Sequence, residues 1–336
     1  MLSEYINETP PVDDCACELV DWIEFQALFN EFQTYKIPNL RTLNEELEDG
    51  VDDEIDVQDN LDEELVQRVY EEINLRTQSL GGAYPFTLDR ENYELCAIET
   101  DEITLGGWIY LYCLILSHAK ADSVLKKSLG LTGNDLRRKP MQVAATYAAA
   151  AEMGNAISFG FPRPNNTGII DAIDHAFGQT IGEGVALSEP KDGYLVSSKD
   201  AGIDIIAWKN SVDNLPGKLL MYGQVASGYN WEDKSVKNDI DQFKCTFFSD
   251  PPQSPEISSI FIPFCIPPNS HGTLKNRLNG LAAKFGIVYY RYRLPRLAED
   301  GWMIGQTAQE GFEKFIDHIE DSSCFRETVE SFLANP

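Results

Sequence analysis

Short apolar runs alternate with helical patterns in the second half of the chain, and this alternation sets its fold class. Four runs rich in β-branched and aromatic residues have the length of strands: residues 203–208, 218–225, 257–264 and 287–292. Helical periodicity occupies two of the intervals between them, at residues 232–243 and 272–285. Strands that alternate with helices favour an α/β domain, in which helices cover a sheet.

The first half of the chain has a different character. Apolar residues recur at helical spacing in four segments, at residues 17–32, 65–79, 105–118 and 141–153. The segment 161–167, with two prolines and two asparagines, predicts a linker. We therefore predict a mainly helical domain over residues 1–165. An α/β domain over residues 166–336 would follow, with a helix at 168–178 and one or two closing helices within 305–333.

The charge of the chain is unevenly distributed. The net charge is −27, and residues 1–100 hold 26 acidic and 5 basic residues. Residues 251–300 hold 3 acidic and 6 basic residues. We interpret the acidic run at 45–64 as a solvated loop and helix start rather than a binding tail. The acidity thus belongs to the N-terminal domain and does not exclude nucleic acid as a partner of the second domain.

Three features predict a cytoplasmic protein that does not enter a membrane. The sequence has no apolar run of 18 residues or more, and residues 105–116 are too short to span a bilayer. The N-terminus is acidic and lacks the pattern of a signal peptide. The seven cysteines are odd in number and widely spaced, which indicates reduced thiols.

Asp204 is the most informative polar residue, because it lies inside an apolar run. A carboxylate between Ile203 and Ile205 is costly to bury unless it is hydrogen-bonded, paired or bound to a metal. Gln224 ends the next predicted strand. Two neighbouring strands with one oxygen ligand each could hold Mg²⁺ or Mn²⁺, whose bound water can attack a phosphodiester. Alternatively, Asp204 caps a turn and the backbone satisfies Gln224.

A family resemblance bears on this choice. The stretch GIDIIAW, a hairpin through LPGK and then LLMYGQVASGYNW resembles the core of the PD-(D/E)XK nuclease superfamily, and more narrowly restriction-endonuclease-like proteins of bacterial defence loci. In this family, an Asp on one strand is followed on the next strand by Glu or Gln, one residue and Lys. The resemblance covers most of residues 65–245 and is most specific over 178–240. It implies a restriction-endonuclease-like mixed sheet flanked by helices, and a metal-dependent DNA endonuclease of anti-phage defence.

The resemblance also implies a set of site residues. Asp204 and Gln224 match the metal-binding and catalytic positions of the two strands. Glu183, in IGEGVAL, matches the acidic residue that the family carries on a helix, and Asp200 is a second candidate for a metal ligand. Both have plainer interpretations, because Glu183 could be a surface residue at a helix end and Asp200 a turn residue.

One position departs from the family pattern. The family's lysine, two residues after Gln224, is replaced by Ala226. That lysine positions the attacking water and stabilises charge on the phosphate. Lys234, in NWEDK, is the candidate substitute, although it could equally be a surface lysine. If nothing replaces the lysine, the chain would be a nuclease-fold subunit that binds DNA or a partner protein without cutting.

Basic residues in the last predicted strand suggest contact with DNA. The segment YYRYRLPRL holds Arg291, Arg293 and Arg296 among tyrosines, and the first two would share one strand face. Arginines interleaved with aromatic residues suit phosphate contact and base stacking, although an edge strand also carries such charges. Lys209, near the proposed site, is a further candidate for DNA contact.

The partners beyond DNA follow from what the sequence lacks. The sequence has no GxxxxGK[ST] phosphate loop, so ATP hydrolysis would need a separate subunit. We therefore expect a partner protein of the same defence system, such as an ATPase or a helicase. The sequence leaves open whether the chain also forms a homo-oligomer.

Overall fold

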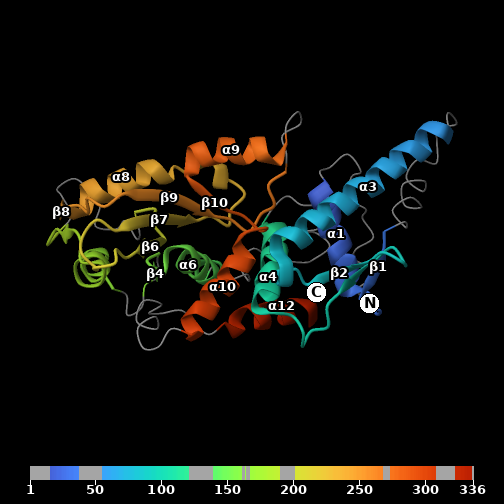
Figure 1. Cartoon of the computed structure of the whole chain (residues 1–336), viewed down its shortest axis with the longest axis horizontal. Coiled ribbons are helices and arrows are strands. Elements are labelled where there is room, and N and C mark those ends of the chain that lie inside the picture. Colours follow the sequence, from blue (N-terminus) through green and yellow to red (C-terminus); the bar gives the residue numbers. More distant parts are fainter. Residues whose placement is uncertain are drawn as a thin grey trace. The chain divides into compact units, whose positions relative to one another are not determined.

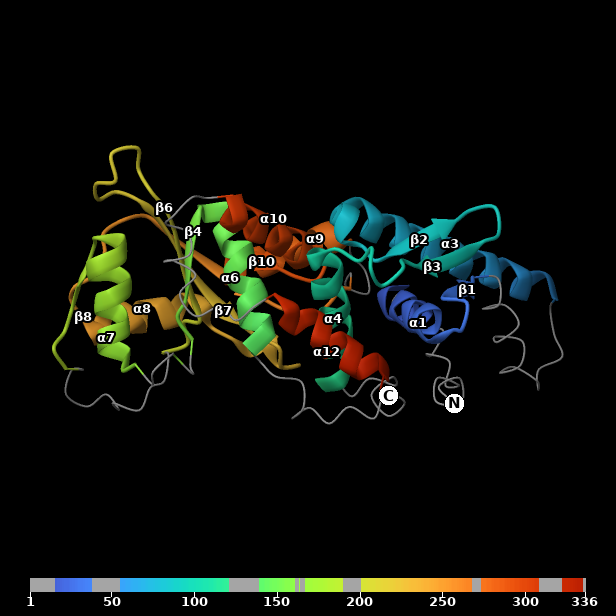
Figure 2. The ribbon, with the colours of Figure 1, turned by 90° about the horizontal axis from the view of Figure 1, so that it is seen from below.

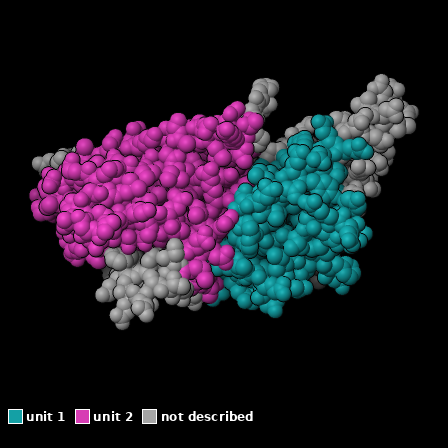
Figure 3. Space-filling view, in the orientation of Figure 1, with its two compact units in different colours: residues 1–136, 325–336 teal, residues 137–324 magenta. Residues whose placement is uncertain are grey.

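The structure is a computed structural model that describes residues 16–37, 55–120, 139–160, 163, 167–189, 201–267, 273–307 and 322–334. The chain is mixed α/β and divides into two compact units, residues 1–136 with 325–336 and residues 137–324 (Figure 3). The predicted boundary at 165 falls inside the second unit. The reason is that α6 (Lys139–Met153) and β4 (Asn155–Ser158) belong to the sheet domain that follows them.

The first unit combines helices with a small sheet. Its helices are α1 (Ala16–Phe29), α3 (Ile55–Leu80), α4 (Leu105–Lys120) and most of α12 (Ser323–Ala334), with a 3₁₀ turn η1 (Gly81–Ala83) after α3. Its strands are β1 (Thr34–Lys36), β2 (Phe86–Asp89) and β3 (Glu94–Ala97), in the antiparallel order β1-β3-β2. The helices at 17–32, 65–79 and 105–118 are confirmed, whereas the sheet was anticipated only as an extended piece at YPFTLD.

A buried ion cluster lies among the helices of the first unit. The Arg76 guanidinium is fully buried and lies 2.8 Å from both the Asp21 and the Glu24 carboxylates. The hydroxyls of Tyr84 and Tyr110 donate to Glu24 at 2.7 and 2.9 Å. Burial, and then the negative charge of Glu24, raises the pKa of Tyr84 well above its ordinary value. Opposite charge and hydroxyl donors together satisfy Glu24, as burial of a carboxylate requires.

The second unit is built on a five-stranded mixed sheet of order β10-β9-β7-β6-β4 (Figure 1). The strands are β4, β6 (Ile205–Lys209), β7 (Leu219–Val225), β9 (Glu256–Phe261) and β10 (Ile287–Tyr289). The first three form an antiparallel meander, and β7, β9 and β10 run parallel. A two-stranded sheet pairs β5 (Val185–Ala186) with β8 (Phe248–Asp250). The predicted α/β class is therefore confirmed for this unit.

Helices cover both faces of the five-stranded sheet. Helix α6 packs against α10 (Leu294–Thr307) on one face (Figures 1 and 2). The other face carries α8 (Val236–Phe247) and α9 (Leu274–Phe285). The remaining helical segments are α7 (Ile169–Ile173), the π-helix η3 (Asp174–Ile181) and the 3₁₀ turn η4 (Trp231–Asp233). Helix α9 shows why its bounds could be predicted: the Thr273 side chain caps its start, and Gly286, at φ +82°, ends it.

Two further expectations concern membranes and thiols. None of the helices that the structure describes is long and apolar enough to cross a bilayer. Among the described cysteines, five are free thiols, namely Cys96, Cys113, Cys245, Cys265 and Cys324. Cys17 is disulfide-bonded, so the prediction of reduced thiols fails at that residue.

Candidate functional site

Asp204 lies at the start of β6, next to the end of β7. Its backbone N–H donates to Gly223 O at 2.9 Å, and Val225 N–H donates to its carboxylate Oδ2 at 2.8 Å. The backbone N–H groups of Phe159 and Gly160 both donate to Asp204 O, at 2.7 and 2.9 Å. Two consecutive amides that bond to one carbonyl are typical of a β-bulge, which redirects side chains at the end of a strand. Asp204 and Gln224 are thus on neighbouring strands, as expected.

The two side chains lie on different faces of the sheet. Tyr222 stacks on Phe177 and lies edge-on to Phe243 of α8, so Gln224, two residues further along β7, shares the α8 face. In contrast, Asp204 Oδ1 lies beside Gly160 and Gln142, and Gln142 belongs to α6. Helices α6 and α8 cover opposite faces (Figure 1). In this structure, the pair therefore does not converge on one cation.

Gln224 is nevertheless an unusual residue. Its side chain is 5% exposed, and its Oε1 finds no hydrogen-bond partner among the described residues. Burial also raises the pKa of the neighbouring Tyr222 hydroxyl, with smaller contributions from the charges of Glu256 and Glu183. Tyr222 therefore stays neutral, and Gln224 is buried on the same face of the sheet. A buried amide oxygen without a partner is costly.

A cluster of polar groups surrounds Asp204 on the α6 face. An ideal Cβ on Gly160 would lie 2.6 Å from Asp204 Oδ1 and 2.8 Å from Gln142 Nε2. Gln142 Nε2 donates to Ser158 Oγ at 2.7 Å. Asp204, Gln142 and Ser158 are each half-buried, whereas Gly160 is buried. We call these four residues the Asp204 cluster. Glycine is required at position 160 because any side chain would displace the carboxylate.

Arg163 brings a positive charge to the same strand end. Its guanidinium Nε donates to Phe159 O at 2.9 Å, and the guanidinium lies 4.8 Å from the centre of the Phe159 ring. Phe159 in turn donates its backbone N–H to Asp204 O at 2.7 Å. The Arg163 side chain is 8% exposed. A guanidinium held in this way is a fixed cation one backbone link from the Asp204 cluster.

Glu183 does not take part in the Asp204 cluster, contrary to the role assigned from the resemblance. Its carboxylate accepts from Gly217 N–H at 3.0 Å and from the Ser254 hydroxyl at 2.6 Å. The Lys218 ammonium donates to Ile181 O nearby. These contacts hold the residues that precede β7 and β9. Because Gln224 lies six residues further along β7, the carboxylate is about 20 Å from that end of the strand. Asp200, the second candidate, lies outside the described residues.

The position at which the family carries its lysine is buried in this chain. Ala226 is 3% exposed, and its N–H donates to Phe261 O at 2.9 Å. Lys234 follows η4 and is half-buried, and its backbone N–H donates to Trp231 O at 3.2 Å. No described contact joins the Lys234 side chain to the Asp204 cluster. Its proposed catalytic role therefore stays a prediction.

The basic residues proposed to contact DNA are placed differently from one another. The strand was predicted to reach residue 292, but β10 ends at Tyr289 and residues 291–293 form a turn before α10. Arg291 is fully buried and donates to Cys265 Sγ, so it does not offer its charge to a surface ligand. Arg293 and Arg296 are exposed. Lys209 is also exposed, but it ends β6, about 17 Å along the strand from Asp204.

Sequence reasoning missed Gln142, Ser158, Gly160 and Arg163. A signal existed in the short segment NAISFGFPR, where a glycine follows an apolar strand-like piece, but nothing local links it to Asp204. Among the described residues, no group of three or more His, Cys, Asp or Glu side chains could hold a metal, so a cation would rely on one carboxylate and neutral oxygens. No family model, curated protein or solved structure matches this chain.

Proposed function

We propose that the second unit is a divalent-metal-dependent nuclease that hydrolyses DNA, with Asp204 as its charged cation ligand. The observation that carries this proposal is the Asp204 cluster, in which a half-buried carboxylate lies beside an amide, a hydroxyl and a buried glycine. Mg²⁺ is commonly held by one or two carboxylates, with waters and substrate phosphates completing its shell. The neighbouring groups fit a hard cation of this kind, with a single carboxylate as the minimum.

The residues of the chain would divide the work as follows. Val225 N–H donates to one carboxylate oxygen of Asp204, and the other oxygen lies beside Gly160 and Gln142. The Gln142 amide, oriented by Ser158, presents its oxygen to the same space. Arg163 is buried, so its charge is not assigned to the phosphate, and no contact among the described residues supplies a replacement for the lysine absent at 226. A divalent cation bound at Asp204 would supply a polarised water for attack on the phosphodiester.

The resemblance supports the biological setting. An antiparallel pair of strands carries Asp204 on one strand and Gln224 on the next, in the order that restriction-endonuclease-like proteins use. We therefore place the activity in bacterial defence against foreign DNA. The exposed Arg293 and Arg296 remain candidates for contact with the DNA backbone.

A second function is favoured by one specific observation. Ala226 is buried where the family has its lysine, so the chain could bind DNA or a partner protein without cutting. The two functions differ in what happens after the cation binds. A nuclease would bind Mn²⁺ and cleave, whereas a binding subunit would retain DNA or the partner protein without cleavage.

The test uses the purified full chain with supercoiled plasmid and Mg²⁺ or Mn²⁺. We expect cation-dependent nicking that chelation abolishes and that Asp204→Asn lowers by at least about a hundredfold. Mn²⁺ binding, followed by calorimetry or electron paramagnetic resonance, should be lost in the same variant. Equal cutting by both proteins would attribute the activity to a contaminant and overturn the proposal.

A glycine pair provides the matched structural control. Gly160→Ala places a methyl group 2.6 Å from Asp204 Oδ1, whereas Gly280→Ala meets nothing within 4 Å. We expect Gly160→Ala to impair Mn²⁺ binding and nicking, and Gly280→Ala to leave both unchanged. Circular dichroism must show that each variant remains folded. If the wild-type protein binds DNA but does not cut it, the second function replaces the first.

A further inference from the structure

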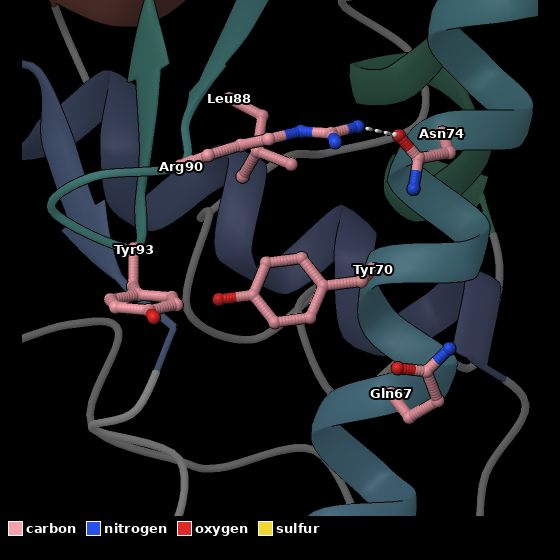
Figure 4. Close-up of a pocket in the computed structure, with 6 residues that line it drawn as sticks. All are labelled: Gln67, Tyr70, Asn74, Leu88, Arg90 and Tyr93. Atoms are coloured by element: carbon pink, nitrogen blue, oxygen red, sulfur yellow. Dashed lines mark hydrogen bonds between the residues drawn. The ribbon is translucent and has the colours of Figure 1, made fainter.

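A small pocket in the first unit lies between α3 and the β2–β3 hairpin (Figure 4). Its volume is about 250 Å³, below the roughly 300–1,000 Å³ of sites that enclose a drug-sized ligand. It can therefore take one small planar group but not a whole large ligand. Six residues line it, from one helix face and one hairpin: Gln67, Tyr70, Asn74, Leu88, Arg90 and Tyr93.

The hairpin contributes Leu88, Arg90 and Tyr93, and its turn gives Tyr93 an unusual backbone conformation. Tyr93 has a φ of +57°, a left-handed conformation that is unfavourable for a bulky residue. The Asp89 carboxylate holds the turn by accepting from the N–H groups of Glu91 and Asn92, at 2.9 and 3.1 Å. The turn thus sustains a strained tyrosine that is 55% exposed at the rim. Strain of this kind clusters at ligand sites.

Tyr70 supplies a second aromatic ring with an unmet hydrogen bond. Its side chain projects from α3 with its hydroxyl directed towards Tyr93 (Figure 4). This hydroxyl is buried, and no described residue forms a hydrogen bond with it. Burial, and then the nearby Tyr93, raises the pKa of Tyr70, so the hydroxyl stays protonated and can donate. A donor without a partner at the wall of a pocket requires an acceptor from water or from a ligand.

Amide and guanidinium groups complete the chemistry of the pocket. Gln67 Nε2 donates to Glu71 at 2.9 Å, which leaves the Gln67 amide oxygen as an acceptor. Asn74 Oδ1 accepts from Arg90 at 3.3 Å, which leaves the Asn74 amide N–H₂ as a donor. The Arg90 side chain is exposed, and a guanidinium has further donors for an anion. Aromatic rings, paired amides and one guanidinium are the groups that recognise an unstacked base and its phosphate.

We propose that this pocket binds a mononucleotide, with the base between the tyrosines and the amides and the phosphate at Arg90. Free mononucleotides fit better than a nucleic-acid strand, because residues 1–100 hold 26 acidic and 5 basic residues and repel a polyanion. The cavity volume accepts the base, and the ribose and phosphate remain at the open rim. The pocket belongs to the first unit, whereas the Asp204 cluster belongs to the second.

Calorimetry with AMP, adenosine and inorganic phosphate on the full chain tests the proposal. We expect AMP to bind at one saturable site, adenosine to bind several-fold more weakly, and phosphate alone not to compete. Tyr93→Ala should weaken AMP about tenfold or more, because it removes a stacking ring. The matched control is Tyr229→Ala, which alters an exposed tyrosine of the second unit and should change nothing.

Two further variants assign the groups. Arg90→Gln should lower AMP affinity to that of adenosine and leave adenosine binding unaltered. Tyr70→Phe removes one hydroxyl without removing a ring, and should weaken both ligands several-fold in a folded protein. Absence of saturable binding by AMP and adenosine, or equal affinities in Tyr93→Ala and Tyr229→Ala, would overturn the proposal. Neither result would bear on the nuclease, whose assay needs no nucleotide.

Discussion

Two carboxylates in apolar segments, Glu24 of the first unit and Asp204 of the second, have opposite surroundings. Glu24 is fully buried, and a guanidinium and two tyrosine hydroxyls hold it. Asp204 is half-buried and lies beside a glycine, an amide and a hydroxyl. A carboxylate enclosed by strong donors has no room for a ligand, and its role is to stabilise the fold. A partly open carboxylate beside a glycine can serve as a site, so burial and partners separate the two roles.

The largest effect that would test this contrast comes from Arg76. Replacing Arg76 with Met leaves Asp21 and Glu24 buried without their guanidinium. Breaking a buried pair by removing one partner costs about 3–5 kcal/mol. We expect the free energy of unfolding of the first unit, measured by urea denaturation, to fall by that amount.

Arg326 offers the matched control. It pairs with a glutamate four residues away, Glu330, as Arg76 pairs with Glu72. The Arg326–Glu330 pair spans 2.7 Å, and its side chains are 50% and 43% exposed. Arg326→Met should therefore cost under about 1 kcal/mol. If Arg76→Met also lowers the free energy of unfolding by less than that value, the buried cluster does not stabilise the fold.

The next largest effect concerns Glu183, whose carboxylate is buried and held by hydrogen-bond donors, as that of Glu24 is. Glu183→Gln removes the charge that accepts from Gly217 N–H and the Ser254 hydroxyl. Hydrogen bonds to charged groups contribute about 1.5–3 kcal/mol, and we expect a loss of that order in urea denaturation. Mn²⁺ binding should be unchanged, because the carboxylate lies at the other end of β7. Lost Mn²⁺ binding at unaltered stability would return Glu183 to a ligand role.

The same contrast shows how much the sequence could predict. Strand β7 was predicted within one residue, because an apolar β-branched and aromatic run follows the turn residues of LPGK. Strand β4 was missed, since NAIS is short and becomes a strand only by pairing with β6. Helix α10 was missed over residues 294–304, because the closing helices were predicted to begin at residue 305, although Pro295 at its second residue suits a helix start.

The candidate site was predictable at one residue and not at its surroundings. Asp204 attracts attention because a carboxylate inside an apolar run needs a reason. Its partners come from α6 and from the end of β4, 62 and 44 residues earlier in the chain at Gln142 and Gly160. Glu183 likewise contacts a turn 34 residues away. Tertiary contacts of this range leave no local pattern in the sequence.

The smallest predicted effect concerns a third carboxylate, that of Asp89 at the end of β2. Its carboxylate accepts from the Asn92 side chain at 2.8 Å and from two backbone N–H groups of the hairpin. The Asn92 side chain, and then the backbone amides, lower the pKa of Asp89 below its ordinary value of 3.8. Because the folded pKa is depressed, the stabilisation is present above the unfolded pKa and is lost as the pH falls through the folded pKa.

An NMR titration of the Asp89 carboxyl should therefore give a midpoint below 3.8. Asn92→Ala removes the largest cause and should raise that midpoint towards the ordinary value. A wild-type midpoint at or above 3.8 would show that the turn is not held by a charged Asp89. The hairpin would then lack the restraint that keeps Tyr93 at φ +57°, and the preformed rim of the nucleotide pocket would lose its physical basis.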